Sequence, residues 1–174
     1  KADRLAFRAE RWRGDNAGPG SLGMARVFIG IGSNINPGSN VEKAIGLLAA
    51  AVKLRGISTV YLTEALRSPE QPPYYNCVVE ADTDLPPMEL KEQVLRRIEQ
   101  ELGRVRGADK YAARPIDLDL ILYDELVATD GDLTLPDPDI VVRPFLAVPL
   151  AELAPNLKLP GSGRRISEIA SALP

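Results

Sequence analysis

The chain contains no histidine and only one cysteine, Cys77, among its 174 residues. The absence of histidine excludes histidine-ligated zinc, a Ser-His-Asp triad and a histidine general base. A single cysteine excludes an internal disulfide, which agrees with a reducing cytosol. Because Cys77 lies in an apolar run, we expect a core residue and not a nucleophile. We therefore expect a cytoplasmic protein whose chemistry depends on other residue types.

The sequence also lacks a net positive charge and any apolar run as long as a transmembrane helix. The net charge is −3 and the pI is about 5.1, so there is no global basic field to hold nucleic acid. No secretory signal is recognisable. With 45% hydrophobic residues, a chain of 174 residues can bury one proper core. These features predict one domain that acts on small molecules and binds neither nucleic acid nor membranes.

Residues 1–23 differ from the rest, because an arginine-rich start is followed by a glycine-containing linker. Three acidic residues, Asp3, Glu10 and Asp15, argue against a transit peptide. Met24 is the expected natural start. We interpret residues 1–23 as an extension, an expression remnant or the end of a fused partner, and residues 24–174 as the single domain.

From Met24 onward, strand and helix patterns alternate. Strands are expected over 26–31, 57–63, 74–81 and through Asp117 and Asp119. Helices are expected over 41–55, with Ser39 and Glu42 as a capping box and Gly56 after its end, and from Pro86 to Gly103. The order βαββαβ predicts an α/β (α+β) fold with a ferredoxin-like core, to which residues 124–174 add turns and short helices.

Asp117 and Asp119 form the most informative pair in the chain. In a β-strand they point to one face, roughly 6–7 Å apart. The opposite face is expected to hold Ile116, Leu118, Leu120 and Leu122. Two carboxylates on a stiff strand suit Mg²⁺, although an isolated D-x-D pattern is more often a solvated face.

Four cations precede this strand: Arg104, Arg106, Lys110 and Arg114. A cationic run is usually a solvated loop, but guanidinium groups are planar forks that suit phosphate oxygens. Together with a metal site, they describe what a nucleoside triphosphate needs. The conjunction of the two patterns therefore indicates chemistry on a phosphate.

A second signal lies at Tyr74 and Asn76, which share one face of a strand. An aromatic ring beside a side-chain amide can stack on a flat heterocycle and bind its edge. In isolation, an aromatic that covers the sheet and an asparagine that caps a turn are the commoner interpretation. Gly32-Ser33-Asn34 is equally open: a tight turn, or a close approach of backbone to ligand.

Five segments, taken together, resemble the 6-hydroxymethyl-7,8-dihydropterin pyrophosphokinase family of folate biosynthesis. They are GIGSN at 30–34, YYNCVV at 74–79, IEQELGRVR at 98–106, KYAARPIDLDLI at 110–121 and LPDPDIVVRPFLAVPLAELAP at 135–155. The resemblance implies a ferredoxin-like enzyme that uses two Mg²⁺ and moves pyrophosphate from ATP to the pterin hydroxymethyl group, giving AMP. Other folate-pathway enzymes are its possible partners.

The resemblance also implies roles for individual residues. Asp117 and Asp119 match the metal-binding aspartates, and with Arg104 and Arg114 they are the expected catalytic residues. The positions expected to bind the pterin are Thr63, Leu66, Tyr74, Asn76, Tyr111 (where the family often has tryptophan) and Phe145. Those expected near ATP are Ile98, Glu99, Arg104, Arg106, Arg114, Leu120 and Arg143.

The chain departs from the family pattern at several positions. Asp132 and Asp137 stand where arginine and histidine are common, and Gly107 replaces a frequent lysine. Near ATP, the two carboxylates would repel charge unless they face solvent or help to hold metal. A catalytically silent pterin- or nucleotide-binding module is therefore one alternative. A palm-type enzyme acting on polynucleotides is another, which the acidic pI opposes.

Overall fold

The structure is a computed structural model that describes residues 23–66, 68–105, 107 and 112–174. Its centre is an antiparallel sheet with the strand order β2-β4-β1-β5, and β3 also pairs with β4. The strands are β1 (Ala25–Ser33), β2 (Lys53–Ile57), β3 (Tyr61–Thr63), β4 (Tyr74–Thr83) and β5 (Asp117–Tyr123). This order is that of a ferredoxin-like βαββαβ unit, so the predicted fold class is confirmed.

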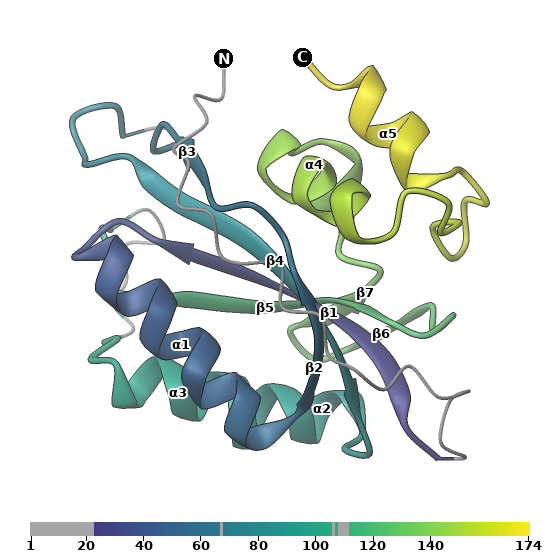
Figure 1. The fold of residues 1–174 in the computed structure, drawn as a ribbon, viewed down its shortest axis with the longest axis horizontal. Helices are drawn as coiled ribbons and strands as arrows, with labels where there is room; N and C mark the ends of the chain where they lie inside the picture. The colour runs from purple at the N-terminus through teal and green to yellow at the C-terminus, as the bar shows by residue number, and fades with distance from the viewer. Residues whose placement is uncertain (1–22, 67, 106, 108–111) are drawn as a thin grey trace.

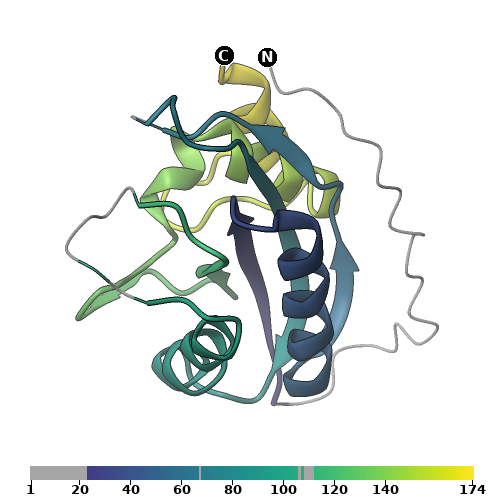
Figure 2. The ribbon, with the colours of Figure 1, turned by 90° about the vertical axis from the view of Figure 1, so that its left-hand side faces the viewer.

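Helices cover both faces of the sheet, as Figures 1 and 2 show. One face carries α1 (Pro37–Ala51) and a helical segment made of α2 (Pro87–Glu89), the π-helical turn η1 (Leu90–Leu95) and α3 (Arg96–Glu101). The other face carries α4 (Pro144–Leu153) and α5 (Ile166–Ala172). Two apolar cores result, one on each side. Cys77 is buried in the first core, as predicted.

The predicted face of Leu122 is wrong, because β5 contains a bulge. The pairing with β1 shifts between Phe28, opposite Leu122, and Ile29, opposite Leu120, which leaves Ile121 as an extra residue. Ile121 and Leu122 therefore both pack into the core beneath α4 and α5, whereas Leu118 and Leu120 pack into the other core. Alternation before the bulge is intact, so Asp117 and Asp119 share the α4 side of the sheet.

Two predicted boundaries also differ from the structure. Helix α1 starts at Pro37, whose fixed φ and missing N–H suit a first helical residue, and it ends at Ala51. Ser39 consequently lies inside the helix, no capping box forms, and Gly56 belongs to β2. The predicted strand 57–63 is divided between β2 and β3. The link between them is fixed by Ser58, whose Oγ accepts from Val78 N at 2.9 Å.

The C-terminal part contains the expected short helices and a hairpin that the sequence reasoning did not foresee. The hairpin consists of β6 (Ala128–Asp130) and β7 (Leu133–Leu135). A 3₁₀ turn, η2 (Pro138–Val141), then leads into α4. None of the helices within the described ranges is long and apolar enough to span a membrane. The interpretation of residues 1–22 lies outside the described residues.

Candidate active site

A pocket of about 230 Å³ lies on the α4 side of the sheet. Its floor is the backbone of β1 at Gly30 and Gly32. One part of its lining is aromatic and neutral, and another part is acidic. The neutral part includes Thr63, Ala65, Leu66, Gln71, Tyr74, Asn76, Phe145 and Leu146, and the acidic part includes Asp117, Asp119, Asp137 and Asp139.

Gly32 separates the two parts of the pocket. A Cβ atom at this position would lie 2.9 Å from Asn76 Oδ1, 3.7 Å from a Tyr74 ring atom and 4.0 Å from Asp117 Cβ. Such a contact with Asn76 is too short for any side chain, so only glycine leaves this floor open. The geometry favours the interpretation of GIGSN as a place where backbone comes close to a ligand.

The neutral part contains a preorganised amide. Asn76 is buried, and its Nδ2 donates to Thr63 Oγ1 at 2.6 Å, so the side chain cannot rotate freely. Tyr74 lies two residues before it on the same face of β4. Burial raises the pKa of Tyr74, and the charge of Arg114 opposes this rise. The ring is therefore a neutral, flat surface at physiological pH.

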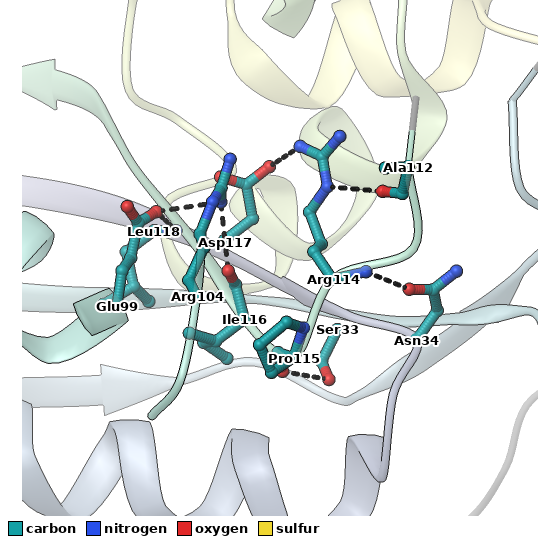
Figure 3. A network of polar contacts seen from close by, with 10 residues as sticks. All are labelled: Ser33, Asn34, Glu99, Arg104, Ala112, Arg114, Pro115, Ile116, Asp117 and Leu118. Atoms are coloured by element: carbon teal, nitrogen blue, oxygen red, sulfur yellow. Dashed lines mark hydrogen bonds and ion pairs between the residues drawn. The ribbon is translucent and has the colours of Figure 1, made fainter. Parts of the chain in front are cut away.

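Asp117 is held by two guanidinium groups, as Figure 3 shows. Its Oδ1 accepts from Arg104, and its Oδ2 accepts from Arg114 Nη1 at 2.7 Å. Arg104 Nη1 also donates to Ile116 O and to Glu99 Oε1, both at 3.0 Å. The buried Glu99 carboxylate in turn accepts from the backbone N–H of Leu118, at 2.9 Å from Oε1. Helix α3 thereby positions Arg104 against the start of β5.

Asn34 anchors the segment that carries Arg114. Its Oδ1 accepts from Arg114 N at 2.8 Å, and its backbone N donates to Arg114 O at 3.2 Å. Its Nδ2 donates to Pro72 O at 3.2 Å and to Gln71 Oε1 at 3.3 Å. The sequence analysis does not identify Gln71, and it names Asn34 only within Gly32-Ser33-Asn34, as a tight turn or a close approach of backbone to ligand. The hydrogen bonds of the buried Asn34 side chain thus join three segments around the pocket.

Asp119 opens into the pocket beside Asp117 and carries a strongly perturbed carboxyl group. Loss of hydration, followed by the charges of Asp117, Asp137 and Glu99, raises its pKa to about 8. The pKa of Asp137 is also raised, chiefly by burial, although its Oδ1 accepts from Asp139 N at 2.8 Å. Carboxyl groups that repel one another in this way form a place where a cation would be favourable.

The other residues expected at the site occupy various positions. The side chains of Ile98 and Leu120 are buried in the core, so only their backbone is available to a nucleotide. Arg143 lies at the N-cap of α4, 3.8 Å from Asp139, and is not part of the pocket lining. Arg106, Lys110 and Tyr111 lie outside the described residues. Asp139 lines the pocket and was not foreseen.

The two acidic departures from the family pattern have different positions. Asp132 is outside the pocket lining, where it pairs with Arg96 and, at 2.8 Å, with Lys91 Nζ. Its charge is thereby compensated at the surface. Asp137, in contrast, lines the pocket together with Asp117, Asp119 and Asp139.

Comparison with known proteins identifies the family. The family model described as 7,8-dihydro-6-hydroxymethylpterin-pyrophosphokinase (HPPK) matches residues 28–155. The chain belongs to the HPPK family. Among its relatives, a protein of Synechocystis named 2-amino-4-hydroxy-6-hydroxymethyldihydropteridine pyrophosphokinase is 40% identical over 146 residues, which cover 82% of this chain and 73% of that protein. A Pseudomonas aeruginosa protein of the same name is 34% identical over 87% of this chain and 93% of its own length.

A further relative of this HPPK chain is a larger protein. The folate synthesis bifunctional protein of Arabidopsis thaliana is 34% identical over 129 residues, which cover 73% of this chain and 26% of the plant protein. The matched range of residues includes Gly30 and Gly32 of the pocket floor and β5 with Asp117 and Asp119.

Proposed function

We propose that this HPPK chain transfers the β,γ-diphosphate of ATP to the hydroxymethyl group of 6-hydroxymethyl-7,8-dihydropterin. In this reaction the hydroxymethyl oxygen bonds to the β-phosphorus, the bond to the α-phosphate oxygen breaks, and AMP leaves. The observation that carries the proposal is the meeting of a flat neutral recess and an acidic, arginine-flanked recess at Gly32, within one pocket. A pterin and a polyphosphate need these two environments side by side.

The neutral part suits the pterin ring. Tyr74 and Phe145 come from β4 and α4 and both line the pocket, so they can stack on a flat ring. Asn76 and the segment from Thr63 to Leu66 offer hydrogen-bonding groups for its edge. The hydroxymethyl group would then extend over Gly32 towards Asp117 and Asp119.

The acidic part has the donor set that Mg²⁺ prefers. Asp117 and Asp119 supply hard oxygen ligands from one face of β5, and loss of hydration together with the neighbouring carboxylates raises the pKa of Asp119. Among the described residues, no group of three or more acidic, cysteine or histidine side chains is arranged as a metal cage. Mg²⁺ is commonly held by one or two carboxylates together with substrate phosphates. When bound, the ions would neutralise phosphate charge and acidify the substrate hydroxyl.

The arginines would exchange partners on ATP binding. Asp117 now has Arg104 and Arg114 on its two oxygens. If Asp117 binds a cation, both guanidinium groups can turn to the phosphate oxygens, where negative charge develops during transfer. Asn34 would keep the backbone of Arg114 in place during this exchange.

The chain has no histidine to accept the hydroxymethyl proton. Asp119 is the candidate acceptor, because its carboxylate faces the pocket on the side towards which the hydroxymethyl group would extend. The folate-pathway name of the plant relative supports the expectation that other enzymes of that pathway are partners.

The direct test is AMP formation from ATP in the presence of purified protein. AMP is expected only when Mg²⁺ and 6-hydroxymethyl-7,8-dihydropterin are both present. A silent binding module would bind the pterin without forming AMP, and a polynucleotide-acting enzyme would require nucleic acid. Asp130→Asn is a matched control, because Asp130 is exposed on β6 and lies outside the pocket lining. Its AMP formation should equal that of the wild type.

A further inference from the structure

Glu152, near the C-terminal end of α4, links this helix to the edge of the sheet. Its Oε2 accepts from Thr59 N at 2.8 Å, and its Oε1 accepts from the Tyr61 hydroxyl. Tyr61 is buried, so its hydroxyl requires a partner within the protein. Although Glu152 itself is exposed, both of its carboxylate oxygens are engaged with the segment that forms β3.

The two elements that Glu152 joins carry separate walls of the pterin recess. Strand β3 ends at Thr63, which lines the pocket and accepts from Asn76 Nδ2. Helix α4 carries Phe145, which also lines the pocket. Glu152 follows Phe145 by seven residues, so both project from the same side of the helix. A contact at Glu152 therefore acts on the distance between Thr63 and Phe145.

Strand β3 needs such support because its own pairing is short. It has three residues and pairs with β4, and no other strand in the described part of the chain pairs with it. Such a short edge segment is held by few ladder hydrogen bonds and opens easily on its own. The bonds to Glu152 are added at Thr59 and Tyr61, immediately before and within the strand.

We propose that Glu152 is a positioning residue for pterin binding. By holding β3 against α4, it sets the separation of the Thr63 and Phe145 walls before the substrate arrives. The inference rests on the proposed function, since it takes the pterin as the occupant of this recess. It predicts that loss of the link weakens pterin binding and leaves nucleotide binding unchanged, because the arginine and aspartate side does not depend on β3.

The test compares two tyrosines that each lose one hydroxyl. Tyr61→Phe removes the bond to Glu152 and keeps the ring. Tyr123→Phe is the matched control, because its hydroxyl donates to Leu85 O at 3.0 Å and it lies outside the pocket lining. Calorimetry with the pterin, in the presence of Mg²⁺ and α,β-methylene-ATP, should show a Kd raised about tenfold for Tyr61→Phe only. The Kd of α,β-methylene-ATP alone should be unchanged in both variants.

Variants of Glu152 provide the second measurement. Glu152→Ala removes both acceptors and should raise the pterin Kd at least as much as Tyr61→Phe. Glu152→Gln should return it to within about threefold of wild type, because the amide can accept from Thr59 N and donate to the Tyr61 oxygen. Equal pterin Kd values for Tyr61→Phe, Glu152→Ala and Tyr123→Phe would overturn the proposal. Failure of the proposed function is distinguishable, because it appears in the wild type: AMP would not form, whether or not the pterin binds. Absence of pterin binding by the wild type would overturn both proposals.

Discussion

Replacement of Glu99 by alanine should destabilise the fold strongly although Glu99 belongs to the site. Glu99 is 2% exposed, and its carboxylate accepts from Leu118 N at 2.9 Å and from Arg104 Nη1 at 3.0 Å. Glu99→Ala leaves the Leu118 N–H buried without this acceptor, at a cost of about 1–3 kcal/mol. It also removes a buried partner of Arg104, a change that costs about 3–5 kcal/mol when the cation has no other partner. Because Arg104 keeps Asp117 and Ile116 O, we expect about 3 kcal/mol in total.

Urea unfolding is the assay for this prediction. With an m value of about 2 kcal/mol per M, a loss of about 3 kcal/mol lowers the midpoint by roughly 1.5 M at unchanged m. Glu99→Gln keeps one acceptor oxygen and should lose clearly less. Glu101→Ala, at an exposed position two residues later, should shift the free energy of unfolding by less than about 0.5 kcal/mol. If Glu99→Ala were no more destabilising than Glu101→Ala, the structural role assigned to this carboxylate would be refuted.

Three further predictions concern the pocket and the core. Tyr74→Ala and Phe145→Ala should each weaken pterin binding, by about 0.5–1.5 kcal/mol beyond the lost area, with ATP-analogue binding far less affected; equal losses for both ligands at unchanged stability would contradict the stacking assignment. Asp117→Asn and Asp119→Asn should each lower Mg²⁺-dependent AMP formation by orders of magnitude with the fold intact, whereas a loss of stability with normal turnover per folded molecule would make these residues structural. The Cys77 thiol, whose pKa burial raises to about 12, should react with a thiol reagent at pH 8 only as fast as the protein unfolds, and rapid labelling of folded protein would contradict its buried position.

The raised pKa of Asp119 predicts that the stability of the protein depends on pH. Its folded pKa of about 8 lies above the ordinary aspartate value of 3.8, so the folded state retains a proton that the unfolded chain releases. The stability from this group is fully present below pH 3.8 and is lost as the pH rises through about 8. In the presence of a chelator, the free energy of unfolding of Asp119→Asn should lack this decline. Between pH 4 and pH 8, wild type should therefore lose stability relative to Asp119→Asn. Parallel stability curves for the two proteins would contradict the assignment.

Local patterns in the sequence were sufficient to predict those features that depend on a single helix or strand. The two-residue period of a strand by itself predicts that Asp117 lies beside Asp119, and Tyr74 beside Asn76, and both pairs line the pocket. The element order predicted the ferredoxin-like sheet, because βαββαβ units have few compact arrangements. Gly103, with a φ of 86°, ends the second helix as expected.

Features that require contacts between distant elements were decided only by the tertiary structure. The bulge that turns Leu122 into the second core arises from pairing with β1. Helix α1 starts at Pro37, so the capping box predicted at Ser39 and Glu42 does not form. The different positions of Asp132 and Asp137 likewise follow from how the β6–β7 hairpin packs. A strand pattern determines which face a side chain takes, because that depends on backbone geometry alone. Whether that side chain meets an arginine, a carboxylate or solvent depends on chain segments far away in sequence, and only folding brings these together.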